Sequence, residues 1–529
     1  MKNILFILLF ISGYSKAQTP TIKWWFDVDD SSFGQSAMDD LNGDGKKDVV
    51  FGCYRNDSMV YALNGANGAL LWKYNTSGSA EGCNDVAMLI CDIDTDGKKE
   101  VIVPSSCNPK TFCFNGLNGT VRWTANTSGS DSPPVLADLN KDQIPEIIHG
   151  EFGGSVRSLN GLNGTLNWQF SVDSDSWIQT APTLVDLDGN GQTDFVVATW
   201  HFSNNNKVYA YNGANHSLMW SYPLSDVVYH GTAVADLDKN GRPELILGDY
   251  SGTLTALHHD GTLFWNYNAG AYIGSPVSVA DIDGDGFCEL VFCASNKVIA
   301  LNHDGSLLWN YTLPGYSTSF RGAALCDMNG DTKPDVVFGT SKGVLMALNG
   351  MNGNQLWSLD LAAHYGDTLD FDHAPVIGDM DLDGYLDIFI VGGYTQYPNF
   401  SVNYGRAYAV STSQIATAGN NWPMFQYNIQ RNCSKCGVAP VGIQEVKMDY
   451  VPLIYPNPAH TAETIHIHMD PLEELMEIHI SDLTGRILYS SRVISHEMDF
   501  KVPFIPSGMY FLTLQTNRAK RVQSLLIEE

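Results

Sequence analysis

A nine-residue pattern occurs eight times between residues 40 and 387, and it constrains the fold more than any other feature of the chain. Each copy reads acid, apolar, Asp or Asn, any residue, Asp or Asn, usually Gly, two further residues, then Asp or Glu. An apolar stretch typical of a β-strand follows each copy. The first positions are 45 to 52 residues apart. A period of this length predicts a repeat architecture in which every unit is one small sheet.

Positions 1, 3, 5 and 9 of each copy carry carboxylate or amide oxygens. Calcium takes six to eight oxygen ligands, and a tight loop supplies them from alternate positions because every second side chain points inward. Glycine at position 6 relieves the sharp turn. We therefore expect up to about eight calcium ions as cofactors. The expected metal ligands are Asp40, Asn42, Asp44, Asp48, Asp92, Asp94, Asp96, Glu100, Asp138, Asn140, Asp142, Glu146, Asp186, Asp188, Asn190, Asp194, Asp236, Asp238, Asn240, Glu244, Asp281, Asp283, Asp285, Glu289, Asp327, Asn329, Asp331, Asp335, Asp379, Asp381, Asp383 and Asp387.

Two copies depart from the pattern at position 6, where the third has Gln143 and the seventh has Thr332. A side chain at this turn costs strain, so the occupancy of these two loops stays open. A single copy would be read as an ordinary turn rich in Asp and Asn. Eight copies in register favour calcium loops flanked by strands, unlike the helical EF-hand, which closes with Glu at position 12.

The loops also explain the charge of the chain, which is -28. They contain 27 of its 58 acidic residues at the ligand positions, so bound divalent ions would offset much of the excess. Nucleic acids and anionic membrane surfaces select basic patches, so neither is an expected partner.

A second cassette follows each loop, for example Val60 to Trp72, which reads as a strand, an Asn/Gly turn and a strand. A recurring Trp at its end is expected to pack between neighbouring sheets. About four strands per repeat predict an all-β fold, an eight-bladed β-propeller with seven blades as the alternative. The segment Thr21 to Phe26 resembles the Trp strand of a blade, and we expect it to complete the last blade and close the ring.

These cassettes resemble known families. The acidic loops resemble the FG-GAP and VCBS repeats of integrin-like propellers, and the Ala-Leu-Asn-Gly to Trp cassettes are similar to the Trp-docking repeats of pyrroloquinoline quinone-type propellers. Together they cover roughly residues 21–432. The resemblance implies a propeller fold, which hosts many functions.

Residues 1–17 have the layout of a signal peptide, a lysine followed by an apolar run and Ser15-Lys16-Ala17. We divide the rest into a propeller over 18–436, a linker over 437–450 and a C-terminal domain over 451–529. No later stretch has the roughly 18 apolar residues that a transmembrane helix needs, so no such segment is expected in the mature chain.

The C-terminal domain contains Tyr455-Pro456-Asn457-Pro458, then Asp482-Leu483-Thr484-Gly485-Arg486, then Pro506-Ser507-Gly508, with alternating apolar residues between them. The alternation predicts a small antiparallel β-sandwich. The order of the motifs resembles the type A sorting domain of type IX (Por) secretion in Bacteroidota. This resemblance implies the type IX secretion machinery and its sortase as partners, and a secreted or cell-surface protein.

Export permits disulfides, and two cysteine pairs are close in sequence, Cys107 with Cys113 and Cys433 with Cys436. The second pair is interpreted as a local clip, because a CxxC metal site would need a second such motif. The other pairings cannot be deduced from sequence.

Propellers usually bind ligands at one mouth of the central channel. The segments before the loop-bearing strands hold a mixture of aromatic, basic and acidic residues that suits a glycan or protein ligand, although scattered loop residues are the alternative. The candidates are Trp177, Tyr229, His230, Tyr272, Arg321, Asp372 and His373, with Asp370 beside them.

No catalytic residue is assigned. A ligand-binding or adhesion scaffold is the favoured function, and a calcium-dependent polysaccharide lyase of the rhamnogalacturonan lyase type is the alternative. A lyase would use His230 or His373 as base and Arg321 to hold uronates.

Overall fold

The computed structural model of the chain describes residues 19–78, 81–416 and 423–424, and, further on, 453–455, 459–460, 464–468, 475–482, 486–495, 497–501, 505–516 and 520–528. The chain forms two compact units, Met1–Gln444 and Glu445–Glu529. The described residues are almost entirely in strands, which confirms the all-β prediction; α1 (Leu361–Tyr365) is the one α-helix among them. None of their helices is long and apolar enough to cross a membrane. The predicted signal peptide and linker lie outside the described residues.

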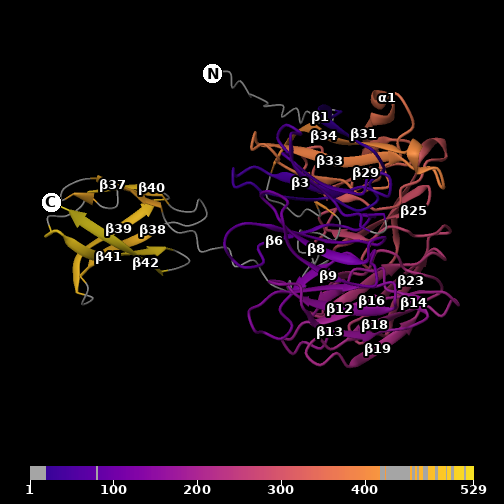
Figure 1. Cartoon of the computed structure of the whole chain (residues 1–529), viewed down its shortest axis with the longest axis horizontal. Helices are drawn as coiled ribbons and strands as arrows, with labels where there is room; N and C mark the ends of the chain where they lie inside the picture. Colours follow the sequence, from indigo (N-terminus) through magenta and orange to yellow (C-terminus); the bar gives the residue numbers. More distant parts are fainter. Residues whose placement is uncertain are drawn as a thin grey trace, which may run out of the picture. The chain divides into compact units, whose positions relative to one another are not determined.

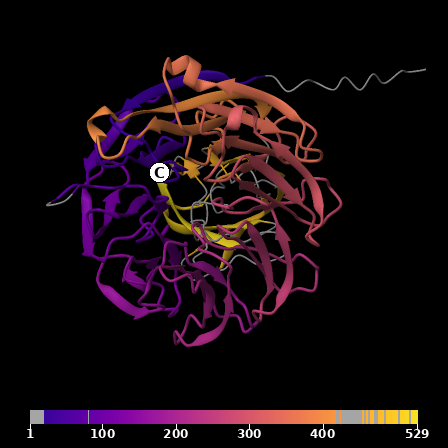
Figure 2. The same ribbon diagram turned by 90° about the vertical axis from the view of Figure 1, so that its right-hand side faces the viewer.

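The larger unit consists of four-stranded antiparallel sheets that follow one another around a ring (Figure 2). Sheets 1 to 4 are β2 (Ala37–Asp39), β3 (Asp48–Gly52), β4 (Met59–Leu63), β5 (Leu70–Asn75); β6 (Leu89–Cys91), β7 (Glu100–Pro104), β8 (Lys110–Asn115), β9 (Val121–Asn126); β10 (Val135–Ala137), β11 (Glu146–Gly150), β12 (Ser155–Asn160), β13 (Leu166–Ser171); and β15 (Thr183–Val185), β16 (Asp194–Ala198), β18 (Lys207–Tyr211), β19 (Leu218–Pro223).

The second half of the ring repeats this arrangement. Sheets 5 to 8 are β20 (Ala233–Ala235), β21 (Glu244–Gly248), β22 (Thr253–His258), β23 (Leu263–Asn268); β24 (Ser278–Ala280), β25 (Glu289–Ala294), β26 (Lys297–Leu301), β27 (Leu307–Thr312); β28 (Ala324–Cys326), β29 (Asp335–Gly339), β30 (Val344–Leu348), β31 (Gln355–Asp360); and β32 (Val376–Gly378), β33 (Tyr385–Tyr394), β34 (Tyr404–Ile415), β1 (Thr21–Val28). The short first strands of successive sheets contact one another, as β20 contacts β24 and β24 contacts β28, so they line the inside of the ring. Two short strands, β14 (Ser176–Trp177) and β17 (Trp200–His201), form a separate two-stranded sheet. In the chain, β14 precedes the first strand of sheet 4, and β17 lies between its second and third strands.

The N-terminal strand β1 closes the last sheet. It lies beside β34 (Figure 1). The two strands pair antiparallel, with Trp24 opposite Ala409 and Phe26 opposite Ala407. The order of sheet 8 is therefore β1-β34-β33-β32. This confirms the predicted closure, which removes the free edge that an open ring would leave.

A tryptophan of one sheet docks against a turn of the next. The Trp72 indole N–H donates to the Gly116 carbonyl at 2.6 Å, and a Cβ at Gly119 would lie 2.6 Å from the Trp72 ring. Only glycine leaves room for this contact. The equivalent indole hydrogen bonds of Trp24, Trp123 and Trp309 measure 2.6–2.7 Å. The predicted packing between sheets is thus confirmed at these positions.

A disulfide links Cys83, which precedes β6, to Cys107, which lies between β7 and β8. The close spacing of Cys107 and Cys113 does not make them a disulfide, because Cys113 lies inside β8 and is buried among apolar side chains of sheets 2 and 3. The Cys433 and Cys436 pair lies outside the described residues.

The C-terminal unit has two sheets. The three-stranded sheet is β35 (Leu453–Tyr455), β37 (Thr464–His468) and β40 (Glu497–Lys501), and the five-stranded sheet is β36 (Ala459–His460), β42 (Lys520–Glu528), β41 (Gly508–Thr516), β38 (Leu475–Ser481) and β39 (Ile487–Ser495). β36 pairs with β42 in parallel, so the purely antiparallel arrangement predicted here is wrong at this edge. The two strands are far apart in sequence, so no hairpin imposes the antiparallel direction.

Candidate metal centres and binding pocket

Each nine-residue loop joins the first and second strands of one sheet. In every sheet the residue before position 1 pairs with the residue at position 9, as Asp39 does with Asp48, Ala235 with Glu244 and Gly378 with Asp387. The eight loops are therefore the same hairpin connection in the same register. We number them first to eighth in chain order.

Three hydrogen bonds recur in all eight loops. The carboxylate at position 9 accepts from the N–H of position 2 at 2.7–3.2 Å. The carboxylate at position 1 accepts from the N–H of position 6 at 2.8–3.1 Å. The side chain at position 5 accepts from the N–H of position 7 at 2.7–2.9 Å. The acidic side chains thus fix the conformation of the loop through hydrogen bonds to its own backbone.

The third and seventh loops keep this geometry despite their departures from the pattern. Gln143 and Thr332 have φ of 68° and 71°, in the left-handed region where Gly45 has 82°. A non-glycine residue pays roughly 1–2 kcal/mol for this conformation. These loops therefore form, at a conformational cost that glycine at position 6 avoids. The second, fifth and eighth loops pay the same kind of cost at position 4, where Thr95, Lys239 and Leu382 have positive φ.

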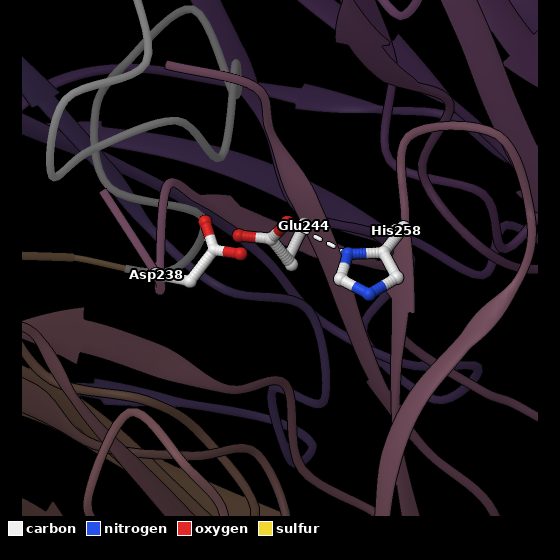
Figure 3. A group of neighbouring side chains, drawn as sticks. All are labelled: Asp238, Glu244 and His258. Carbon is white, nitrogen blue, oxygen red and sulfur yellow. Dashed lines mark hydrogen bonds and ion pairs between the residues drawn. The ribbon is translucent and has the colours of Figure 1, made fainter. Parts of the chain in front are cut away.

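Possible metal ligands converge in five loops: three carboxylates in the second, fourth, sixth and eighth loops, and two carboxylates and a histidine in the fifth. In each, three ligand atoms lie within 4.8 Å of one another. Such oxygen sets suit a hard divalent cation such as calcium. In the fifth loop the group comprises Asp238, Glu244 and His258, whose Nδ1 is 3.1 Å from Glu244 Oε1 (Figure 3). His258 comes from β22, outside the nine-residue pattern, and was not predicted.

The position 9 carboxylates are buried and hard to ionise without a cation. Burial, together with repulsion from neighbouring loop carboxylates, raises the pKa of Asp48 and Asp194 to about 6. The same causes raise the pKa of Glu146 to about 7 and the pKa values of Glu289 and Asp335 to about 8. Buried carboxylates that repel one another are groups that a divalent ion would stabilise in the charged form.

In the second and eighth loops a cationic side chain pairs with the ligand carboxylates. Lys23 of β1 places its Nζ 2.6 Å from Asp381 and 3.0 Å from Asp387 in the eighth loop. Burial opposes the charge of Lys23, but hydrogen bonds to the two carboxylates outweigh burial and raise its pKa. Arg122 of β9 lies 2.5 Å from Asp94 and also pairs with Glu100 in the second loop. These side chains would compete with a metal ion for the same oxygens.

A pocket of about 410 Å³ lies among connections at the opposite edge of the sheets. Because antiparallel strands alternate in direction, the connection from the second to the third strand, and the one that enters the first strand, lie at the edge away from the acidic loops. The pocket is lined by Phe33, Tyr54, Arg55, Asp85, Tyr229, Arg321, Asp372, Thr395, Tyr397 and Phe400. A smaller cavity of about 230 Å³ shares Asp372 and is also lined by Tyr272, Thr318, Phe320, Ser341, Asp370 and Phe371.

The predicted ligand residues are only partly brought together. Tyr229, Arg321 and Asp372 line the larger pocket, and Tyr272 lines the smaller one. Trp177 lines neither cavity; its ring packs on those of Phe152, Trp200 and Phe202.

The two histidines proposed as bases for a lyase are buried and line neither cavity. Burial and the nearby Arg321 guanidinium lower the pKa of His230 well below its usual value. His373 Nε2 lies 2.8 Å from the Ser36 hydroxyl. Neither ring is placed where it would meet a ligand in the pocket.

Several pocket residues were missed from sequence. Phe33 and Asp85 precede first strands, so the rule that selected the other candidates could have found them. Tyr54, Arg55 and the segment 395–400 follow second strands instead. The prediction considered only one of the two kinds of connection at this edge.

Three family models match the chain. The model described as outer membrane protein assembly factor BamB matches residues 152–330 and, again, 205–435. An FG-GAP-like repeat matches residues 40–103, and a secretion system C-terminal sorting domain matches residues 453–528. The resemblances drawn from the motifs are confirmed. No curated protein gives a significant match.

Solved structures share the fold at low sequence identity. The V. cholerae biofilm matrix protein Bap1 is 15% identical, with a TM-score of 0.57, over 80% of this chain and 97% of Bap1. Saccharomyces cerevisiae Sqt1 is 11% identical, with a TM-score of 0.53, over 74% of this chain and 99% of Sqt1. Quinohemoprotein alcohol dehydrogenase from Comamonas testosteroni is 12% identical, with a TM-score of 0.52, over 77% and 79% of the two chains. Identities this low establish the fold alone.

Proposed function

We infer that the chain, which belongs through residues 152–435 to the family whose model is described as outer membrane protein assembly factor BamB, is an exported eight-bladed β-propeller. We propose that this propeller is stabilised by calcium and serves as a ligand-binding scaffold. Its sorting domain indicates type IX secretion to the cell surface or outside. The sorting domain also implies contact with the type IX secretion machinery. The biofilm matrix protein among its structural neighbours fits an adhesion role.

The eight identical hairpins carry this proposal. Each of the eight four-stranded sheets found among the described residues contributes one acidic loop in the same register, and we interpret each sheet as one blade. Loop hydrogen bonds orient the acidic side chains, and the position 9 carboxylates are buried. Binding of ions that the unfolded chain cannot hold in this geometry would add directly to folding stability.

Up to about eight calcium ions are proposed, with unequal affinities. The second and eighth loops are expected to bind most weakly, because Arg122 and Lys23 already pair with their carboxylates. The third and seventh loops pay the left-handed backbone cost at Gln143 and Thr332. The first and fourth loops have glycine at positions 4 and 6, and no Lys or Arg side chain pairs with their ligand carboxylates among the described residues. The fifth loop has Lys239 in the left-handed region at position 4, and in the sixth loop the Lys333 ammonium donates to the Asp283 carbonyl.

The test is calcium titration of the full mature chain after chelation, with bound metal counted by elemental analysis and stability followed by thermal melting. We expect several ions per chain and a large calcium-dependent rise in melting temperature. A chain that binds no calcium at millimolar concentration, and whose melting temperature is unchanged, would overturn the calcium assignment. Deletion of residues 445–529 should abolish export without changing the calcium response.

The lyase alternative has less support. Its candidate bases, His230 and His373, line neither cavity, and the carboxylates of Asp85 and Asp372 stand in the pocket that would have to hold uronates. A lyase would release unsaturated uronate products in the presence of calcium. Their appearance would replace the scaffold proposal with an enzymatic one.

A further inference from the structure

We propose that the larger pocket and the aromatic side chains beside it bind a neutral polysaccharide. This inference rests on the proposed scaffold function and names the ligand class of its pocket. It is drawn from three features: the aromatic lining, the balance of charges in the pocket, and the extent of the aromatic surface beyond it.

Aromatic rings form much of the pocket wall. The Phe33 and Tyr54 ring centroids are 5.2 Å apart, Tyr54 and Phe400 are 6.4 Å apart, and Tyr397 and Phe400 are 5.7 Å apart. The Tyr397 side chain is 79% exposed. An aromatic ring held in this way offers an apolar face and, in tyrosine, a hydroxyl that bonds at its edge, which suits the apolar faces and hydroxyl rim of a sugar ring.

Polar groups of both signs stand among these rings. Arg321 is 6% exposed and lies over the Tyr229 ring at 4.9 Å, and its Nε is 3.4 Å from Asp372 Oδ1. That distance is longer than a strong charge-assisted hydrogen bond, so both groups keep capacity for a ligand. Arg55 lies 5.3 Å from the Phe400 ring centroid. Guanidinium donors beside carboxylate acceptors can bond sugar hydroxyls, which both donate and accept.

The charge balance decides between neutral and charged polymers. The pocket lining contains two guanidinium groups, Arg55 and Arg321, and two carboxylates, Asp85 and Asp372. A polyanion would meet the two carboxylates, and a polycation would meet the two guanidinium groups. A neutral hydroxylated chain avoids both penalties.

The aromatic surface extends beyond the pocket, which suits a polymer better than a single sugar. Trp200 contacts Tyr229 at 5.9 Å between ring centroids and Tyr250 at 5.3 Å. Trp177 lies 6.5 Å from Trp200 and 5.1 Å from the exposed ring of Phe202. The rings thus run from the pocket across neighbouring sheets at the edge opposite the acidic loops.

The test uses the full mature chain in calcium, with affinity electrophoresis and calorimetry on a soluble neutral β-glucan, a neutral galactomannan and polygalacturonate. We expect at least one neutral polymer to bind, and Tyr397→Ala to weaken its binding at least tenfold. Tyr397 is well exposed, so its loss should not unfold the protein. The matched control is Tyr316→Ala, because Tyr316 is 94% exposed and lines neither cavity.

Each outcome separates this inference from the function on which it rests. Equal loss in both variants, stronger binding of polygalacturonate, or no binding of either neutral polymer would overturn the neutral-polysaccharide assignment. Thermal melting of the same samples with and without calcium reports on the scaffold independently. A calcium-stabilised protein that binds no neutral polymer would leave the scaffold standing and remove only this ligand.

Discussion

Replacing Glu289 by glutamine should change stability in opposite directions with and without calcium. Glu289 is position 9 of the sixth loop and is 1% exposed. Its Oε2 accepts the Ile282 N–H at 2.8 Å, an interaction that a glutamine oxygen can keep. Its Oε1 is buried and has no hydrogen-bond partner among the described residues. A glutamine amide placed there could donate to the neighbouring aspartates.

The magnitude follows from the pKa of this carboxyl. Burial first, and then Asp283, Asp285 and Asp281, raise the pKa of Glu289 from 4.5 to about 8 in the ion-free fold. At pH 7 the fold therefore keeps a proton that the unfolded chain releases, at a cost of about 3 kcal/mol. Glutamine removes this cost. The unfolding entropy is about 2 cal/mol/K per residue, over the roughly 400 residues of the larger unit. Dividing about 3 kcal/mol by this entropy predicts that the chelated variant melts about 4 °C higher than the chelated wild type.

The direction of this pKa shift also predicts how the stability of the protein depends on pH. Because the pKa is raised on folding, the chelated wild type should lose stability as pH rises from about 4.5 to about 8, and Glu289→Gln should flatten this slope. In saturating calcium the order should reverse, because the neutral side chain is a weaker ligand than the carboxylate. Thermal melting at several pH values in chelator and in calcium measures both effects.

Glu151→Gln is the matched control, since Glu151 is also buried but lies outside the loops. Burial opposes its charge, but the hydrogen bond from Arg157 at 2.6 Å and nearby groups lower its pKa. Its substitution should destabilise the protein at pH 7 both with and without calcium. If Glu289→Gln behaves like this control and destabilises the chelated protein, the claim that burial and repulsion at Glu289 destabilise the ion-free fold is refuted.

Three further substitutions test other parts of the structure. Lys23→Met should destabilise the chelated protein by about 1–3 kcal/mol, since it leaves two carboxylates of the eighth loop unpaired. Calcium should then raise the melting temperature of this variant more than that of the wild type. An unchanged calcium response in melting experiments would contradict this. Trp72→Phe should cost about 1–2 kcal/mol in chemical unfolding, because the Gly116 carbonyl loses its indole donor; a neutral result would mean that the indole hydrogen bond adds nothing. Replacing Cys83 and Cys107 together by serine should cost about 3 kcal/mol in chemical unfolding, since the disulfide closes a 24-residue separation. Reduction of the wild type should cost at least as much in the same assay, because Cys288 is also disulfide-bonded; a smaller loss on reduction would contradict this.

The nine-residue pattern was enough to predict the loops and the sheets around them. Their conformation depends on local hydrogen bonds, such as Asp40 with the Gly45 N–H, between residues only a few positions apart. The strands that follow are β-branched and apolar, as strands prefer. The N-terminal strand was also predictable, because Trp24 repeats the docking tryptophan of the other sheets. Local chemistry repeated eight times determines this much of the protein.

The tertiary structure decided which distant residues meet. Cys107 bonds to Cys83 rather than to its near neighbour Cys113, because β8 directs Cys113 into the core. Lys23 reaches the eighth loop only because ring closure places β1 in the last sheet. No spacing in the sequence encodes these meetings, because they depend on how the sheets are joined around the ring.

The binding pocket shows the same division. The sequence identified Tyr229, Arg321 and Asp372 as candidates, but Tyr54 and Phe400, which line the same pocket, come from connections between second and third strands that the prediction did not consider. Residue type and local pattern determine what each loop can contribute. The direction of every strand, and the closure of the ring, determine which loops share an edge, and only the folded chain contains that information.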